Sequence, residues 1–101
     1  MFDKAKELYQ LQKKAKEVQK ELKNTEVEAQ SSDGSVTVLF TADQKIKSID
    51  ISNEALKPEN KKDLEEKLVK VISEGISRAQ AVAAEKTKGL MSEMGLNIPG
   101  M

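Results

Sequence analysis

The side chains best placed for binding chemistry are five lysines that repeat at helical spacing near the N-terminus. In a helix, which turns by about 100° per residue, they share one contiguous face: Lys6, Lys13, Lys16, Lys20 and Lys23. That face would run for about 25 Å at 1.5 Å rise per residue and can neutralise several phosphates of a nucleic-acid duplex. It can equally be an ordinary solvated face with local Lys and Glu pairs, and the spacing alone leaves both interpretations open.

Catalytic chemistry has far fewer candidate residues. The sequence contains no His and no Cys, which removes the usual neutral-pH proton shuttle, thiol nucleophiles, disulfides and thiolate metal sites. One acidic cluster, Asp63, Glu65 and Glu66, lies where acids complement the dipole at the start of a helix. The sequence has no glycine-rich phosphate loop, Ser/His/Asp set or metal-ligand spacing. We therefore expect a protein that is not an enzyme and that uses no metal, cofactor or small-molecule substrate.

The distribution of charge along the chain indicates which kind of partner the lysines could bind. The chain has 17 basic and 17 acidic residues, but residues 1–24 carry seven lysines against four acids, whereas residues 25–60 carry three against seven. Positive charge is therefore concentrated on the N-terminal segment. Arg78 is the only arginine, and lysines mainly contact phosphates, which carry little sequence information. If the partner is DNA, we expect the protein to bind it with little dependence on base sequence.

Size and hydropathy predict a small protein without a membrane segment. We expect a single domain over residues 1–101, and a chain this short has marginal stability unless it forms oligomers. No apolar run approaches the roughly 20 residues that cross a bilayer. The first seven residues also carry four charged side chains. We therefore expect a soluble, cytoplasmic protein.

Two long helices are predicted to flank a small sheet. The first spans residues 2–24, which contain no Gly or Pro, and its apolar residues step by three and four as in a coiled coil. The second runs from about residue 59 to residue 88, and its broader apolar arc predicts that it lies on the sheet and meets another helix. Gly75 lies within that arc, which favours close approach of another backbone. Residues 89–101 are interpreted as a short helical turn followed by a flexible tail.

The stretch between the helices is the only one with the period-two pattern of strands. Asp33-Gly34 is suited to a hairpin turn with positive φ. Ile46 breaks the parity of Ile49 and Ile51, which predicts a bulge or a side chain on the other face. The predicted strands are a short one around residues 27–29, then residues 35–42 and residues 46–52.

One face of this sheet is strongly apolar and needs a cover. Val36, Val38 and Phe40 share that face, whereas Leu39 points to the opposite one. A three-stranded ribbon is too small to be stable without further packing. A helix of the chain or a second copy must therefore cover this face. We expect an α+β fold of order α-β-β-β-α, in which a small antiparallel sheet flanked by two long helices faces the core of a homodimer.

The order and spacing of these pieces resemble the YbaB/EbfC family of bacterial nucleoid-associated proteins over nearly the whole chain. No single piece is diagnostic, but the order of the set is fairly specific. The matching pieces are the Lys/Gln/Leu-rich first helix ending in Glu21-Leu22, Val27-x-Ala29 with Asp33-Gly34, Val36-Thr-Val38, Ile46-Lys-Ser-Ile-Asp-Ile51, Pro58-Glu-Asn-Lys61 before Leu64-Glu65, Ala79-x-x-x-Ala83, and Gly95-Leu-Asn-Ile-Pro-Gly100.

The resemblance implies a homodimer whose projecting helical arms grip duplex DNA in the nucleoid with little or modest sequence preference. By position, the implied DNA contacts are the five lysines of the first helix and the basic residues late in the second helix, Arg78, Lys86 and Lys88. We expect the dimer interface to use apolar residues of the helices and the sheet. These are Leu8, Leu11, Val18, Leu22, Leu39, Phe40, Ile72, Gly75 and Ile76.

A second hypothesis is a helix-and-hairpin interaction module, similar in outline to a prefoldin-type holdase, whose arms clasp a protein partner. Its support is the apolar seam from Leu8 to Leu22, the side chain of Leu39 and the methionines near the C-terminus. The seam extends over only about two heptads, which is short for such arms. DNA binding is therefore the preferred hypothesis.

Overall fold

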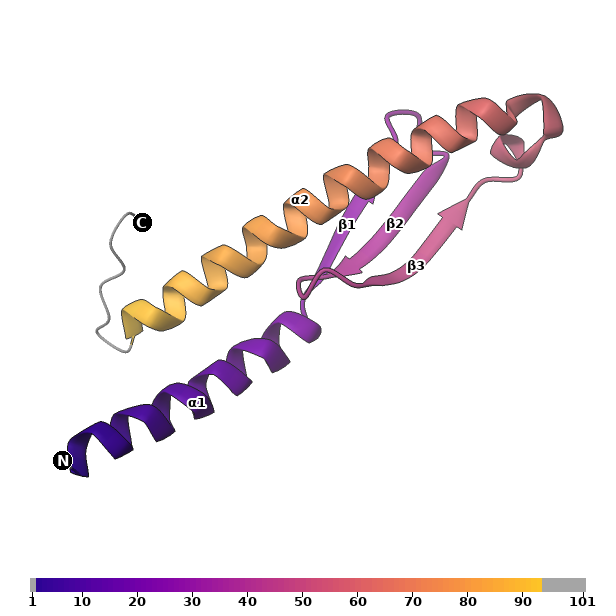
Figure 1. Cartoon of the computed structure of the whole chain (residues 1–101). Helices are drawn as coiled ribbons and strands as arrows, with labels where there is room; N and C mark the ends of the chain where they lie inside the picture. The colour runs from indigo at the N-terminus through magenta and orange to yellow at the C-terminus, as the bar shows by residue number, and fades with distance from the viewer. Residues whose placement is uncertain (1, 94–101) are drawn as a thin grey trace.

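The computed structural model describes residues 2–93 and has the predicted order, helix, three strands, helix (Figure 1). Two short 3₁₀ turns, η1 and η2, connect the third strand to the second helix, and Pro58 begins the later of them. The elements are α1 (Phe2–Lys23), β1 (Glu26–Gln30), β2 (Val36–Thr41), β3 (Ile46–Ile51), η1 (Glu54–Leu56), η2 (Pro58–Asn60) and α2 (Lys61–Glu93). The predicted α+β class is confirmed.

The three strands form an antiparallel sheet in the order β1-β2-β3. Gly34, in the first turn, has φ of 76°, as the Asp-Gly pair predicts. Between β2 and β3 the register shifts at Leu39 and Phe40, so that Phe40 lies opposite Ile46 while Val38 lies opposite Ile49. The bulge predicted from the parity of Ile46 is therefore confirmed, and it puts Ile46 on the same face of the sheet as Ile49.

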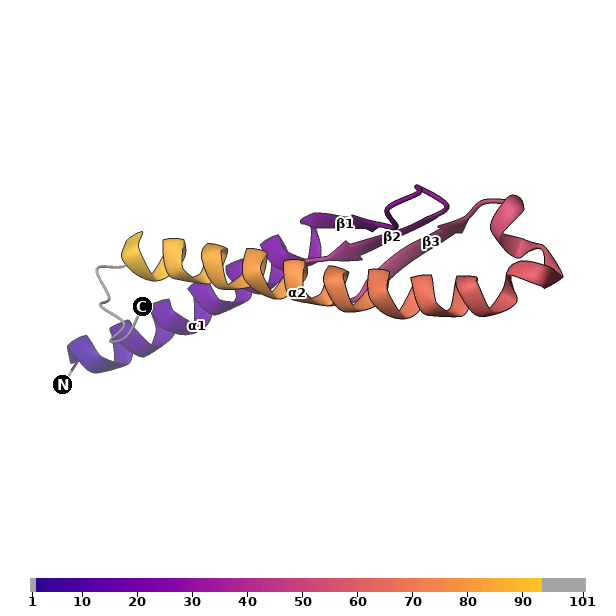
Figure 2. The ribbon, with the colours of Figure 1, turned by 90° about the horizontal axis from the view of Figure 1, so that it is seen from above.

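Helix α2 covers one face of the sheet and contacts mainly β1 and β2 (Figures 1 and 2). Its buried residues Val71, Gly75 and Ala79 recur every four positions and form the stripe that faces the strands. The core they close is aliphatic apart from one aromatic ring, and consists of Val27, Ala29, Val36, Val38, Phe40, Ala42 and Val71. The apolar face of β2 is thus covered by α2 of its own chain, as the broad apolar arc of the second helix predicted.

Phe40 and Gly75 meet in this core. The Phe40 ring lies so close to Gly75 that a Cβ at that position would be 1.9 Å from Cε2 of the ring. Gly75 therefore makes room for a side chain, and the predicted close approach of a second backbone is wrong. Both residues are buried within one chain, which leaves Phe40 no surface to offer a dimer interface.

Strand β3 is much less covered than the other two strands. Ile46 and Ile49 are each 47% exposed, although they lie on the face that α2 covers over β1 and β2. Helix α2 also carries exposed apolar side chains, Val69 and Ile76. Strand β3 therefore keeps an open apolar strip, which is formed by Ile46 and Ile49.

Helix α1 projects away from the sheet and runs antiparallel to the last third of α2 (Figures 1 and 2). The chain measures 68 × 24 × 15 Å and its radius of gyration is 18.8 Å, against about 13 Å for a compact domain of this length. Two helical arms extending from a small sheet account for this elongation. Between residues 2 and 93, no helix combines the length and hydropathy needed to span a bilayer.

The second helix is longer than predicted. It continues through Gly89 and ends at Glu93, whereas the sequence predicted an end near Lys88. Gly89 has open space around its Cα, so no packing conflict interrupts the helix there. The remainder of the predicted tail, residues 94–101, lies outside the described residues.

Candidate nucleic-acid interface

The five lysines of α1 lie on the side of the helix that faces away from α2. All five are exposed, and the face they share is opposite Leu11, Val18 and Leu22, which point toward α2. Among the side chains that the structure describes, none of these lysines forms an ion pair, although Lys14, outside the set, pairs with Glu17 at 3.4 Å. Their positive charge is therefore not neutralised by neighbouring carboxylates.

Tyr9 belongs to the same surface and was not among the sequence candidates. It is 68% exposed, and at about 100° per residue it falls in the middle of the arc between Lys13 and Lys16. A tyrosine hydroxyl can donate a hydrogen bond to a phosphate oxygen. Helical spacing could have identified Tyr9 as a member of this surface, because its position falls among the lysines and away from the apolar seam. We call the six residues Lys6, Tyr9, Lys13, Lys16, Lys20 and Lys23 the lysine face.

The basic residues of α2 are differently placed. The Arg78 guanidinium donates a hydrogen bond to the backbone carbonyl of Glu28 at 3.0 Å, which ties α2 to β1. The Lys86 ammonium pairs with the Glu21 carboxylate at 2.9 Å, which ties α2 to α1. Lys88 is exposed. Of the three candidates on α2, two thus hold elements of the fold together.

The lysine face ends beside a shallow hollow at the junction of α1 and the sheet. Lys23, Lys45 and Lys47 line it together with carboxylates. Lys47 pairs with Glu26 at 3.4 Å, and Lys45 lies 3.9 Å from Asp43. This end of the surface is accordingly less positive than α1 itself.

One acidic residue at the start of α2, Asp63, has a structural role. Lys67 pairs with Asp63 one turn earlier at 2.8 Å and with Asp33 of the β1–β2 turn at 2.5 Å. The hydrogen bond from Lys67, followed by bonds from Ser35 and Ser31, lowers the pKa of Asp33 well below its usual range. Asp33 and then Asp63 raise the pKa of Lys67. Within residues 2–93 no group of three or more acidic side chains is arranged to hold a metal ion.

The residues predicted for a dimer interface are distributed over three regions. Leu11, Val18 and Leu22 face α2 within the chain, and Phe40 and Gly75 lie in the core. Leu8 is exposed near the free end of α1, and Leu39 is half-buried on the polar face of the sheet. On α2, Ile72 packs partly buried against the core, whereas Ile76 is exposed. The exposed isoleucines of β3 were missed as interface candidates, although their period-two pattern was recognised.

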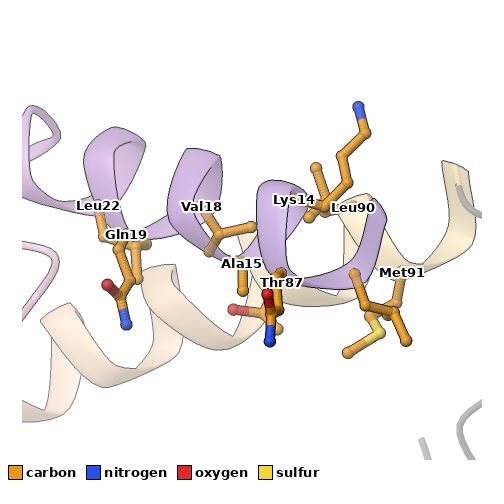
Figure 3. A pocket seen from close by; sticks show the side chains of 10 residues that line it. Lys14, Ala15, Val18, Gln19, Leu22, Thr87, Leu90 and Met91 are labelled. Atoms are coloured by element: carbon orange, nitrogen blue, oxygen red, sulfur yellow. The ribbon is translucent and has the colours of Figure 1, made fainter. Parts of the chain in front are cut away.

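An apolar groove runs between α1 and α2 (Figure 3). It has a volume of about 510 Å³. Lys14 and Gln19 lie at its border, and the Lys14 side chain extends away from it (Figure 3). The groove is lined by Leu11, Gln12, Lys14, Ala15, Val18, Gln19 and Leu22 of α1 and by Thr87, Leu90 and Met91 of α2. It has no cluster of polar groups for catalysis.

Sequence comparison gives a consistent result over nearly the full chain. The sequence profile described as the YbaB/EbfC DNA-binding family matches residues 1–94. A nucleoid-associated protein of Bradyrhizobium sp. (strain ORS 278) is 41% identical over 91 residues, which cover 90% of this chain and 86% of that protein. A nucleoid-associated protein of Afipia carboxidovorans is 36% identical over 96 residues, covering 95% of this chain and 90% of the relative.

A structural relative supports the fold. The crystal structure of an uncharacterized protein from Helicobacter pylori superposes with a TM-score of 0.71, covering 89% of this chain and 90% of the other. The two sequences are 21% identical, so the likeness concerns the arrangement of helices and strands alone.

Proposed function

Because the chain belongs to the YbaB/EbfC DNA-binding family, we propose that it is a non-catalytic, nucleoid-associated protein that binds duplex DNA as a homodimer. Relatives from two genera are named nucleoid-associated proteins, and we extend that location, in the cytoplasm, to this protein. The observation that carries the proposal is the lysine face of α1, which is exposed and carries no ion pairs among the described side chains.

We propose that the lysine face contacts the phosphates of the duplex. From Lys6 to Lys23 it extends about 25 Å along the helix, and duplex DNA presents one negative charge per about 1.7 Å of its axis. Several phosphates therefore lie within reach of one helix. Contacts of this kind release condensed counterions, so affinity falls steeply as salt concentration rises. Because the net charge of the whole chain is zero, its affinity for DNA then depends on the local positive charge of α1.

Low sequence specificity follows from the residue types on this surface. Direct reading of bases relies on forked arginine contacts to guanine and on amide contacts to adenine. The only arginine, Arg78, is bound to the Glu28 carbonyl. Lysine contacts to phosphate position a protein on DNA without distinguishing base pairs.

We propose that the open strip along β3 is the dimer interface. Strand β3 is an edge strand with unpaired backbone groups, and edges of this kind are normally covered in a stable protein. Ile46 and Ile49 would pack against the same surface of a second copy, together with the flank of α2 that carries Val69 and Ile76. An isologous contact of this kind repeats the same patch on both subunits. The arms of both copies would then project from one shared core.

The test is fluorescence anisotropy of a labelled DNA duplex titrated with the full chain over a series of salt concentrations. We expect the logarithm of the binding constant to fall linearly with the logarithm of salt concentration, with similar slopes for AT-rich and GC-rich duplexes. Binding that is insensitive to salt, or absent at low salt, would contradict the proposal. A parallel light-scattering assay with an unfolding client protein addresses the holdase hypothesis, and we expect no suppression of aggregation.

A further inference from the structure

The turn between β2 and β3 and the start of β3 present two lysines beside the end of α1 (Figure 1). Lys45 and Lys47 line a hollow of about 330 Å³ together with Lys23. Lys23 is the last member of the lysine face, so the hollow begins where that face ends. The row of ammonium groups on α1 therefore continues beyond the helix and onto the sheet.

The turn that carries Lys45 is fixed by hydrogen bonds to its surroundings. Gln44 has φ of 67°, a left-handed conformation that is uncommon for residues other than glycine. The backbone amide of Thr41 donates a hydrogen bond to the carbonyl of Lys45 at 2.9 Å, which closes the turn. The side-chain amide of Gln80 donates to Oε1 of Gln44 at 3.3 Å, which ties the turn to α2. The backbone of Lys45 is therefore held in place beside α1.

The carboxylates of the hollow leave both ammonium groups accessible. The Asp43 side chain is 22% exposed and accepts a hydrogen bond from the Thr41 hydroxyl, whereas the Lys45 side chain is 76% exposed. The Lys45 ammonium is therefore the outer group of this pair. Lys47 pairs with Glu26 at 3.4 Å, and both side chains are about half exposed. An exposed ion pair contributes little to stability, so a phosphate can replace Glu26 as the partner of Lys47.

Lys47 lies on the side of the sheet away from the isoleucines of β3. Its partner Glu26 is on the exposed face of β1, the face that α2 leaves open. Ile46 and Ile49 lie on the other face, together with Phe40 and Val38. A dimer that forms through these isoleucines therefore leaves Lys47 exposed to a ligand.

We propose that Lys45 and Lys47, together with Lys23, form a second phosphate-binding site for duplex DNA at the junction of α1 and the sheet. The inference rests on the proposed function, because it extends the DNA contacts of the lysine face. A duplex held by one helix alone is free to pivot about the axis of that helix. Phosphate contacts fix the orientation of a protein on DNA, so a contact on the sheet sets the direction in which the duplex leaves α1.

The first experiment is fluorescence anisotropy of a DNA duplex over a salt series with Lys45→Gln and Lys47→Gln combined. Four lysine contacts in a dimer contribute about 0.9 each to the slope of log K against log salt, so the slope should fall by up to about 4, with about tenfold weaker binding at low salt. The matched control combines Lys57→Gln and Lys62→Gln. Both of these lysines are exposed, and Lys57 pairs with Glu54 at 3.0 Å as Lys47 does with Glu26. The control should keep the native slope.

A substitution of opposite sign tests the same site. Glu26→Gln removes the carboxylate that competes with phosphate for Lys47, so we expect about threefold tighter binding at low salt. Glu54→Gln makes the same change in net charge beside Lys57, at the other end of the sheet (Figure 1), and should leave the affinity as in the native chain. Equal effects of the two substitutions would contradict a local contact at Lys47.

Crosslinking measures proximity to DNA independently of affinity. The sequence contains no cysteine, so Lys45→Cys accepts a single photo-activated crosslinking group. We expect this chain to crosslink to the duplex at low salt, and a chain labelled at Lys57→Cys to give no crosslink. Either a native salt slope in the chain with glutamine at residues 45 and 47 or the lack of a crosslink from residue 45 would overturn the inference. The proposed function stands in both cases if the native chain binds the duplex, and it fails together with the inference if the native chain does not.

Discussion

The ring of Phe40 occupies the space in which a side chain on Gly75 would begin, since a Cβ there would lie 1.9 Å from Cε2 of the ring. This contact joins the central strand β2 to the middle of α2. It also explains a glycine inside a helix, where glycine costs about 1 kcal/mol relative to alanine. Glycine is nevertheless required at this position, because any side chain there would collide with the Phe40 ring.

Gly75→Ala is expected to destabilise the protein by about 1–3 kcal/mol, the usual range for overpacking a core, although alanine favours the helix. Urea unfolding at a fixed protein concentration measures the change. Phe40→Leu in the Gly75→Ala background should recover part of the lost stability, because the two side chains compete for one space.

Gly89→Ala is the matched control on the same helix. A Cβ at Gly89 meets nothing within 4 Å, so only helix propensity changes, and we expect up to about 1 kcal/mol of added stability. If Gly75→Ala stabilised the protein as Gly89→Ala does, the packing interpretation would be wrong.

Replacing Lys13, Lys16 and Lys20 by glutamine should weaken DNA binding and reduce its salt dependence. Each phosphate contact contributes about 0.9 to the slope of log K against log salt, so a dimer that loses six contacts loses up to about 5. Anisotropy over a salt series measures both quantities. The control is glutamine at Lys61, Lys62 and Lys70, which are exposed on α2 and give the same change in net charge. Equal losses in both variants would argue against a localised surface.

Tyr9→Phe tests whether the hydroxyl on the lysine face contacts DNA. Losing one neutral hydrogen bond costs about 1 kcal/mol, so we expect about fivefold weaker binding with an unchanged salt slope, because no charge is removed. Circular dichroism should be unaffected, since Tyr9 is exposed on the helix. An unchanged affinity would remove Tyr9 from the interface.

Ile49→Glu is expected to convert the dimer into monomers. Ile49 is 47% exposed within one chain, so a single chain tolerates the carboxylate, whereas burying it at an interface is costly. Size-exclusion chromatography with light scattering reports the mass. Ser48→Glu, on the opposite face of β3, should remain dimeric. DNA affinity should fall in Ile49→Glu alone, because two linked sites are reduced to one.

The Asp33 carboxylate should make stability depend on acid pH. Its pKa is lowered by the hydrogen bond from Lys67, so the folded state resists protonation more than the unfolded state. The stabilisation is present above the ordinary value of 3.8 and is lost as pH falls below it. Urea midpoints between about pH 5 and pH 2 should fall less steeply in Lys67→Gln than in the native chain. Lys70→Gln should keep the native pH dependence.

Much of the local structure could be predicted from the sequence because it depends on neighbouring residues. The uninterrupted run of helix formers specifies α1, and the alternation around Val36 and Val38 specifies β2. The parity of Ile46 located the bulge, and Asp33-Gly34 located the turn with positive φ. The helical spacing of the lysines likewise put them on one face, since that spacing is fixed by the geometry of the helix itself.

The sequence predicted that the second helix lies on the sheet, but it could not say which strands that helix covers, because periodicity identifies an apolar face without identifying its partner. The tertiary structure decided that α2 covers Val38 and Phe40 within one chain and leaves Ile49 open. It also decided that Arg78 is engaged by a carbonyl of β1, whereas the five lysines of the lysine face form no ion pair among the described side chains. These outcomes depend on contacts between residues far apart in the chain, and such contacts are set by how the elements pack rather than by local pattern.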